Sequence, residues 1–449
     1  MTYALWALGA LPFLILAAIG LRYLVRGTPV SRVRMAGIRG HGPLDDDAQY
    51  RQSLQLLAHV PFTDGNRVLL LRCGDDTYPR LFADLSAARR TITLQMYYCQ
   101  PGRLADRLHE VLVERARAGV KVLFLWDAFG SHNLSDEYRE SLVAAGVRVA
   151  VFRPVEWWAL EKAYNRSHIR VVAIDGRLGY TGGFGIDDKW LGDGRTADQW
   201  RDTNVRFAGP AVAGLQATFA AGWAEATGDL LTERSFFDHD GDGDGDDDEE
   251  ADSDAVDDGS AGGGHGGVTA GVMHAAPTIG STAAERFLAL AITGARHRLY
   301  ISNAYFVPDD DFCSLLGESA RRGVDVRILV PGENTDVRST RMASRARYEQ
   351  LLRSGVRLYE YRPTMMHAKT IVADGCAGSV GTMNFDNRSL AFNDESNFVF
   401  LDERVGRDLQ AMFEEDLLLS TEIELATFLR RPWTERLQER LFSAMARIL

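Results

Sequence analysis

The chain has 449 residues, 46% of them hydrophobic, and this size and composition predict at least two globular domains. Its net charge of −12 arises in residues 238–258, which hold 13 of the 62 acidic residues and none of the 50 basic ones. The remainder is nearly neutral and has no basic stripe, which argues against a nucleic-acid partner. The four cysteines are far apart and show no C-x-x-C spacing, so neither a zinc site nor a disulfide framework is predicted.

Residues 1–26 are predicted to form a membrane anchor. The stretch 3–21 has no charged residue, and at about 1.5 Å per residue it nearly spans the hydrocarbon core of a bilayer. A signal peptide would carry basic residues before its apolar stretch, whereas here Arg22 and Arg26 follow it. The positive-inside rule therefore predicts a single-pass protein with its domains in the cytoplasm, and a cleaved signal or a buried helix is the alternative. Residues 27–60 are predicted to be a polar tether with a short amphipathic piece.

Alternating strand and helix patterns begin at about residue 66 and predict an α/β layered domain over residues 61–232. The expected strands cover residues 68–71, 91–98, 119–126 and 146–152, and the expected helices cover residues 78–88, 103–117 and 136–145. The same order returns about 205 residues later, which predicts a second copy of the domain over residues 278–430. Its helix covers residues 284–295, and its strands cover residues 298–306, 323–330 and 355–361.

The segment between the copies, residues 233–277, is rich in Asp and Glu and then in Gly. It has almost no large apolar residue, so we expect it to be a disordered linker. Asp238, Asp240, Asp242 and Glu249 formally match a calcium-binding loop. A dense run of Asp and Gly matches such a pattern by chance, so a solvated acidic linker is the preferred interpretation.

The last segment, residues 431–449, is predicted to be an amphipathic helix. Its apolar residues recur at every fourth position: Trp433, Leu437, Leu441, Met445 and Leu449. We expect this face to pack on the second domain, and contact with a membrane surface is the alternative.

After these elements, each copy reaches a strand that carries a histidine and a cation. His367 and Lys369 are two residues apart in the second copy, and His168 and Arg170 in the first. Alternate residues of a strand share a face, so each imidazole and cation should project side by side. A neutral imidazole attacks or protonates, and the neighbouring cation stabilises an oxyanion.

The paired histidine strands, each closed by an aspartate (Asp175 and Asp374), resemble the motif of the phospholipase D superfamily. Within it the chain is most similar to bacterial cardiolipin synthases, and the similarity extends from about residue 65 to the end. It is carried by the segments 127–131 (DAFGS), 180–183 (YTGG), 200–206 (WRDTNVR), 305–309 (YFVPD), 366–369 (MHAK) and 385–395 (FDNRSLAFNDE). The resemblance implies two α/β/α sandwich domains in a pseudo-twofold arrangement. The N-terminal anchor followed by basic residues is also similar, although many members have two such spans and this chain has one. We expect this single transmembrane helix to lie in the inner membrane.

The resemblance also implies the roles of the site residues. The catalytic set would be His168, Arg170, Asp175, His367, Lys369 and Asp374. Asp202 would orient the histidine of the first half and Glu395 that of the second. Asn384 would help both cations to hold the phosphoryl oxygens, without a metal or another cofactor. His168 would be the nucleophile and His367 the general acid, although the residues themselves leave this order open.

The implied reaction transfers a phosphatidyl group between two phosphatidylglycerol molecules and releases glycerol. Phosphatidylethanolamine remains open as the acceptor. The first half departs from the family pattern twice, with Arg170 in place of Lys and Gly185 in place of the Asn that would correspond to Asn384. A superfamily phosphodiesterase (phospholipase D or nuclease) and a lipid-binding scaffold with an impaired first site are therefore the alternatives.

Overall fold

The computed structural model describes residues 12–15, 17, 48–154, 165–237, 264–277 and 282–445. Most of the predicted anchor and residues 27–47 of the predicted tether lie outside these ranges, as does the acidic stretch with the calcium-loop match. Residues 12–15 and 17 are helical. Within the described ranges, no helix is long and apolar enough to cross a membrane.

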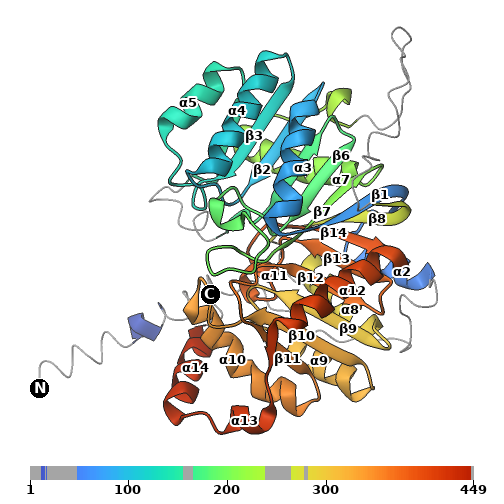
Figure 1. The fold of residues 1–449 in the computed structure, drawn as a ribbon, viewed down its shortest axis with the longest axis vertical. Coiled ribbons are helices and arrows are strands. Elements are labelled where there is room, and N and C mark those ends of the chain that lie inside the picture. The colour runs from blue at the N-terminus through green and yellow to red at the C-terminus, as the bar shows by residue number, and fades with distance from the viewer. Residues whose placement is uncertain are drawn as a thin grey trace, which may run out of the picture.

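The first half alternates strands and helices in the predicted order (Figure 1). Its strands are β1 (Thr63–Arg72), β2 (Thr91–Met96), β3 (Lys121–Asp127), β4 (Arg148–Phe152), β5 (Arg170–Ile174), β6 (Leu178–Gly182) and β7 (Thr203–Ala208). Its helices are α3 (Cys73–Ala87), α4 (Arg103–Arg117), α5 (Asp136–Ala144) and α7 (Val212–Thr227), with two short 3₁₀ turns at Asp188–Trp190 and Arg234–Phe236.

The second half repeats this order. Its strands are β8 (His265–Ala275), β9 (Arg298–Asn303), β10 (Asp325–Pro331), β11 (Arg357–Tyr361), β12 (Lys369–Ala373), β13 (Ala377–Gly381), β14 (Glu395–Leu401) and β15 (Ser420–Glu422). Its helices are α8 (Ala283–Gly294), α9 (Asp310–Arg321), α10 (Arg338–Arg353), α11 (Asn387–Ala391), α12 (Glu403–Leu418), α13 (Leu425–Leu429) and α14 (Trp433–Met445).

The strands of both halves form one sheet, in the order β15-β11-β10-β9-β12-β13-β14-β8-β1-β7-β6-β5-β2-β3-β4. Strands β8 and β1 pair antiparallel at its middle. Outward from this pair, β14-β13-β12-β9-β10-β11 on one side corresponds to β7-β6-β5-β2-β3-β4 on the other. The sheet therefore shows the predicted repeat directly, and the two halves are joined by continuous backbone hydrogen bonds.

Strand β8 corrects the C-terminal part of the predicted disordered linker (residues 233–277), whereas residues 238–263 lie outside the described ranges. It pairs with β14 along seven residues and with β1, so it lies near the centre of the sheet. Val268, Val272 and Met273 are buried between layers of helices. The small residues around them leave room for close neighbours: a Cβ on Gly271 would meet the carbonyl oxygen of Pro61 at 2.6 Å. At Gly271, therefore, a residue that suggested disorder is required by tight packing.

Helices cover both faces of the sheet, with three hydrophobic cores between the layers. One core lies beneath α3, α4 and α5 of the first half, and a second lies beneath α8, α9 and α10 of the second half. The third core lies beneath α7 and α12 and draws side chains from both halves. In it the rings of Phe207 and Phe398 lie 4.5 Å apart between centroids. This shared core fixes the halves relative to each other.

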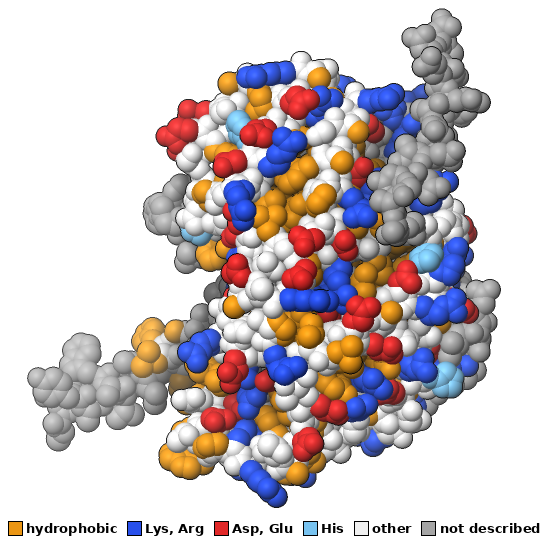
Figure 2. Space-filling model, in the orientation of Figure 1, with side chains coloured by type: hydrophobic (Ala, Val, Ile, Leu, Met, Phe, Trp, Pro, Cys, Tyr) orange, Lys and Arg blue, Asp and Glu red, His pale blue; other side chains and the backbone are white. Residues whose placement is uncertain are grey.

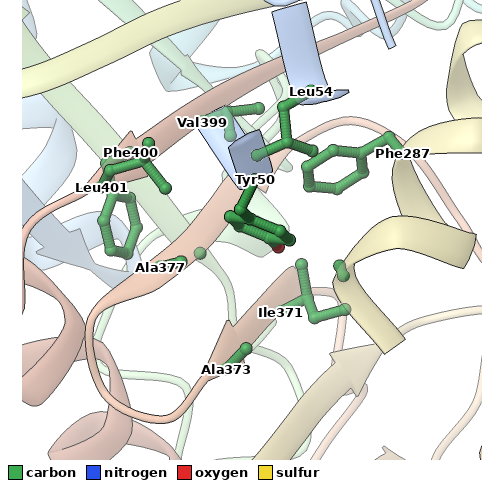
Figure 3. A pocket seen from close by; sticks show the side chains of 11 residues that line it. Tyr50, Leu54, Phe287, Ile371, Ala373, Ala377, Val399, Phe400 and Leu401 are labelled. Atoms are coloured by element: carbon green, nitrogen blue, oxygen red, sulfur yellow. The ribbon is translucent and has the colours of Figure 1, made fainter. Parts of the chain in front are cut away.

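Helix α2 (Ala48–Leu57) precedes the first half in sequence but packs on the second half. Figure 3 shows Tyr50 and Leu54 of α2 beside Phe287 of α8 and Ile371 of β12. Tyr50 is 5% and Leu54 1% exposed. The short amphipathic piece predicted within residues 27–60 is therefore present as α2, but it does not belong to a tether, because its apolar side chains complete the core of the second half.

Helix α14 forms as predicted, but its orientation differs from the preferred expectation. Trp433, Leu437 and Leu441 are 73%, 48% and 60% exposed, so the apolar stripe faces away from the domain. The helix is held instead through Glu439, which is 1% exposed and pairs with Arg345 and Arg431. Buried ion pairs on the opposite side of the helix thus decide which side faces the protein.

Candidate active site

The two histidine strands lie at the centre of their halves. Strand β5 pairs antiparallel with β2 and β6, and β12 pairs in the same way with β9 and β13. Each histidine lies two residues before the start of its strand. Nη1 of Arg170 is 3.1 Å from Nε2 of His168, and Nζ of Lys369 is 2.9 Å from Nε2 of His367. The predicted side-by-side placement of imidazole and cation is confirmed in both halves.

The backbone of each histidine is held by the opposite half. The N–H of His168 donates to the carbonyl oxygen of Asp394 at 2.9 Å, and the N–H of His367 donates to that of Arg201 at 2.7 Å. Isolated bridges join Ser167 to Asp394 and Arg201 to Met366. These exchanged contacts bring two histidines that are 199 residues apart in sequence to one interface between the halves.

The carboxylates are exchanged in the same way, which corrects the expected pairing. Both oxygens of Glu395 lie 3.0 Å from Nδ1 of His168, and Oδ2 of Asp202 lies 2.7 Å from Nδ1 of His367. Asp202 therefore orients the histidine of the second half and Glu395 that of the first, the reverse of the prediction. The cause is the exchanged backbone, because each carboxylate directly follows the residue that holds the opposite histidine.

The hydrogen bonds define which ring nitrogen is free to react. A carboxyl group engages Nδ1 in each half; when it is ionised, Nδ1 carries the proton of the neutral ring and Nε2 presents its lone pair. The cation of the same strand lies at Nε2, where it marks the position of an incoming anion. Nε2 of His168 and Nε2 of His367 are thus the two candidate reactive atoms.

Burial dominates the electrostatics of the site. It lowers the pKa of His168 and His367 well below their usual range, and the nearby cations add to this effect. It raises the pKa of Glu395 to about 8 and lowers that of Lys369 to about 7. Burial also raises the pKa of Asp202. Burial disfavours the charged form of each of these groups. Before substrate binds, both imidazoles are therefore mainly neutral, which is the form that attacks phosphorus.

Further hydrogen bonds orient the carboxylates. The hydroxyl of Thr382 donates to Glu395 at 2.5 Å, and the indole Nε1 of Trp190 donates to Asp202 at 2.9 Å. Neither donor was identified from the sequence. In the sequence, Trp190 lies 12 residues before Asp202, and this proximity was the only available signal.

Aromatic rings line the site and were not predicted either. The ring of Tyr97 meets His168 edge-on at 5.0 Å, while Trp190 and Trp200 lie 5.3 and 4.8 Å from the ring of His367. The ammonium of Lys189 lies 4.1 Å from the centroid of Trp200 and 4.0 Å from that of Tyr98. These rings exclude water from the imidazoles and strengthen the electrostatic interactions between the charged groups.

The structure explains Gly185, the second departure of the first half. A Cβ at this position would meet Cζ3 of Trp190 at 2.8 Å and Cη2 at 2.9 Å. The indole ring therefore occupies the space that the Asn side chain of the family pattern would need. The ring of Trp190 thus fills the volume of the missing side chain, and its Nε1–H donates a hydrogen bond to Asp202.

Two buried polar groups in the site have no hydrogen-bond partner among the described residues: Nε of Arg170 and Oδ1 of Asn384. Arg170 is 2% and Asn384 3% exposed. A buried polar group without a partner costs about 1–3 kcal/mol. Such groups therefore indicate a bound ligand that forms the missing hydrogen bonds. Phosphoryl oxygens would accept from the Arg170 Nε–H, and rotation of the Asn384 amide would present its NH₂ group to them.

Asp175 and Asp374 do not join the site, which corrects their prediction as catalytic residues. They follow the far ends of β5 and β12, about 16 Å along the strand from the cations at a rise of about 3.3 Å per residue. Asp175 accepts from the backbone N–H groups of residues 89–91, and Asp374 from those of residues 296–298. Both residues have a positive φ, 53° and 54°. They anchor the strand ends to the preceding loops.

The arrangement supplies two imidazoles, two cations at their reactive nitrogens and two buried carboxylates. It suits exchange at a phosphodiester, in which one imidazole attacks phosphorus and the other protonates the leaving oxygen. Among the described residues, no group of three or more His, Cys, Asp or Glu side chains is placed to hold a metal ion.

The fold is shared with solved structures of low sequence identity. Phosphatidylserine synthase of Haemophilus influenzae Rd KW20 superimposes with a TM-score of 0.65 and 12% identity, over 89% of this chain and all of that one. Polyphosphate kinase of Porphyromonas gingivalis superimposes with a TM-score of 0.51 and 13% identity, over 80% of this chain and 49% of that one.

Sequence similarity defines the family. The family described as "Cardiolipin synthase, PLD-like domain" matches residues 288–417. Cardiolipin synthase of Geobacillus kaustophilus is 33% identical over 87% of this chain and 74% of its own length. Cardiolipin synthase A of Pseudomonas aeruginosa is 33% identical over 83% of this chain and 71% of its own. The chain therefore belongs to the cardiolipin synthase family of the phospholipase D superfamily and is an enzyme of that type.

Proposed function

We propose that this enzyme makes cardiolipin from two phosphatidylglycerol molecules, with release of glycerol, through a phosphatidyl-histidine intermediate. The observation that carries the proposal is the pair of exchanged histidine–carboxylate contacts, each with a buried cation at the reactive Nε2. Its relatives named cardiolipin synthase support the choice of substrate class. Phosphatidylethanolamine stays open as an alternative acceptor.

In the first half-reaction, Nε2 of His168 attacks the phosphorus of phosphatidylglycerol. The P–O bond to the terminal glycerol breaks, and His367 gives the proton on its Nε2 to the departing oxygen. Arg170 and Lys369 hold the phosphoryl oxygens as charge develops on them. The bound phosphate itself raises the pKa of His367, because a nearby negative charge favours imidazolium.

In the second half-reaction, the now neutral His367 takes a proton from a hydroxyl of the second phosphatidylglycerol. The resulting oxygen attacks phosphorus, the P–N bond to His168 breaks, and cardiolipin leaves. Asp202 stabilises the imidazolium of His367 each time it forms, and Glu395 supports His168. Water in place of the second lipid would give phosphatidic acid, which makes a dry, aromatic-lined site important for transfer.

We also propose that residues 1–26 anchor the enzyme in the inner membrane, with its domains in the cytoplasm. The uncharged stretch 3–21 and the arginines after it support this topology. Protease treatment of inverted and of right-side-out membrane vesicles tests it. Digestion of the domains only in inverted vesicles is the expected result, and digestion only in right-side-out vesicles would contradict it.

The reaction is tested by expression in bacteria that lack cardiolipin synthases, followed by lipid mass spectrometry. The wild-type chain should restore cardiolipin, and His367→Ala, expressed to the same level, should not. Accumulation of phosphatidic acid without cardiolipin would identify a phospholipase instead. Cleavage of single-stranded DNA that is lost in His367→Ala would identify a nuclease, and no product of any kind would identify a scaffold.

A further inference from the structure

Helix α14 exposes an apolar stripe that the fold leaves uncovered. Trp433, Leu437 and Leu441 are spaced by four residues and are 73%, 48% and 60% exposed. Figure 2 shows hydrophobic side chains gathered over α14 at the lower left of the molecule. An exposed Leu is ordinary on its own, but an aligned Trp and two Leu on one helix face indicate a binding surface.

The charged residues of α14 are sorted by side. Glu435 and Glu439 lie on the side that faces the domain, where both pair with Arg345 and Glu439 also pairs with Arg431. Arg440 and Arg436 lie along one flank of the apolar stripe, at helical angles of about 60° and about 100° from its centre. Within the described part of the chain, no carboxylate lies within ion-pair distance of these two arginines. The outward side of α14 is therefore apolar and basic, and the glutamates of the helix are paired with arginines on its inward side.

The inner side of α14 places this surface close to the active site. Phe442 packs against Val307 and Ala343. Val307 follows Tyr305 by two residues, and the ring of Tyr305 lies 6.0 Å from the ammonium of Lys369. One layer of side chains thus separates the exposed stripe from the loop that borders the second half of the site.

We propose that α14 docks the catalytic domains on an anionic lipid surface. A helix with Trp and Leu on one side and Arg beside them lies in the membrane interface, where its apolar face enters the acyl boundary and its cations meet lipid phosphates. The unpaired arginines beside the stripe favour an anionic membrane over a second copy of this chain. Docking here would present the loop of Tyr305, and with it the site, to lipids at the surface.

A fluorescent label on α14 tests the proposal without relying on catalysis. All four native cysteines are buried, so a single cysteine introduced as Leu437→Cys labels selectively with an environment-sensitive dye. The full-length protein is incorporated into phosphatidylglycerol vesicles that contain spin-labelled lipid. The matched control is Gln438→Cys, which is exposed on the same helix about 100° away from Leu437.

The label at position 437 should shift to shorter wavelength and be quenched by the spin-labelled lipid, more strongly with phosphatidylglycerol than with phosphatidylcholine. The label at position 438 should stay accessible to iodide in the water. Equal iodide access at both positions would overturn the proposal. A shift at position 437 that follows protein concentration in lipid-free detergent would also overturn it, in favour of a second copy.

A second set of variants connects the surface to activity. Replacement of Trp433, Leu437 and Leu441 by Ser should raise the apparent KM for vesicle lipid at least about tenfold, because one fully buried Leu already contributes that much. Turnover of a water-soluble short-chain substrate should not change. Leu230→Ser, which alters a leucine that is 78% exposed in the first half, is the control and should change neither. An unchanged KM in the triple variant would contradict the role of the stripe even if the enzyme is fully active.

Discussion

The two halves of the active site reach the same arrangement with different residues. The second half follows the family pattern, with Lys369 beside His367 and Asn384 seventeen residues further on. The first half places Arg170 beside His168 and has Gly185 at the position of the amide. In both halves, a cation lies at Nε2 and a carboxylate of the opposite half lies at Nδ1.

The difference shows that the departure of the first half is coupled to the second. Trp190 fills the space above Gly185, and its indole N–H holds Asp202, the carboxylate that orients His367. A change that looks like loss of a phosphate ligand in one half therefore positions the histidine of the other half. The structure supports an intact site over a degraded one.

The largest expected effect comes from the histidines. His168→Ala and His367→Ala should each lower kcat on phosphatidylglycerol by about 10⁴-fold or more, since removal of a nucleophile or a general acid has effects of this size. A lipid with a nitrophenolate leaving group separates their roles, because this group leaves without a proton. Acid-quenched His367→Ala should then carry labelled phosphatidyl on the protein, and His168→Ala should not. The opposite result would assign the attack to His367.

The next effect tests the coupling through Trp190. Gly185→Asn should reduce kcat/KM by about ten- to hundredfold, because the new side chain displaces the indole and with it Asp202, at a cost of about 1–3 kcal/mol. Gly185→Asn combined with Trp190→Phe should recover part of the loss, since the smaller ring makes room. An increase in activity in Gly185→Asn alone would support the view that the first site is impaired.

The pH dependence distinguishes the two cations. Burial lowers the pKa of Lys369 to about 7, so its ammonium loses its proton as the pH rises through 7 and kcat/KM should fall on the alkaline side. On the acidic side, activity should persist below pH 6.5, because the lowered pKa of His168 keeps the attacking imidazole neutral there. The kcat/KM profile of the wild type between pH 5 and 9 checks both limbs.

Lys369→Arg should be less active but nearly flat above pH 7, because a guanidinium keeps its proton. Arg170→Lys is the matched change in the first half and should make the alkaline fall steeper. An alkaline limb that is the same in Lys369→Arg as in the wild type would show that another group causes it.

The smallest effect on catalysis is expected at Asp175 and Asp374. Asp374→Asn should lower the free energy of unfolding by about 2 kcal/mol or more, since the carboxylate accepts three backbone N–H groups. The kcat per folded molecule should remain within about threefold of the wild type, because the side chain lies far from the phosphate. Thermal unfolding and active-site titration measure the two quantities, and a large loss of kcat in fully folded protein would restore a catalytic role for the aspartate.

The sequence predicted the features that depend on local pattern. The repeat, the order of strands and helices, and the placement of each cation beside its histidine follow from alternation and spacing, and all of them are present. It did not predict which carboxylate serves which histidine, because that depends on how Arg201 and Asp394 pair with the opposite half. This pairing is a long-range property that no local spacing encodes.

Two predictions that rested on amino-acid composition or pattern alone, for β8 and for α14, were wrong because of tertiary packing. Strand β8 is rich in glycine, and at one of these positions, Gly271, the absence of a side chain permits the close approach of Pro61. Helix α14 has an ideal apolar stripe, but the buried ion pairs of Glu439 turn that stripe outward. In both places the deciding contacts come from segments distant in sequence.

The exchanged contacts also have a consequence for the order of events during synthesis. His168 leaves the ribosome long before Glu395, the carboxylate that orients it, has been translated. A nascent first half therefore holds His168 without the carboxyl group that orients its ring and without the second imidazole. The paired site is complete only when the second half has folded against the first, so a chain that ends before β12 carries only one of the two histidine–cation pairs.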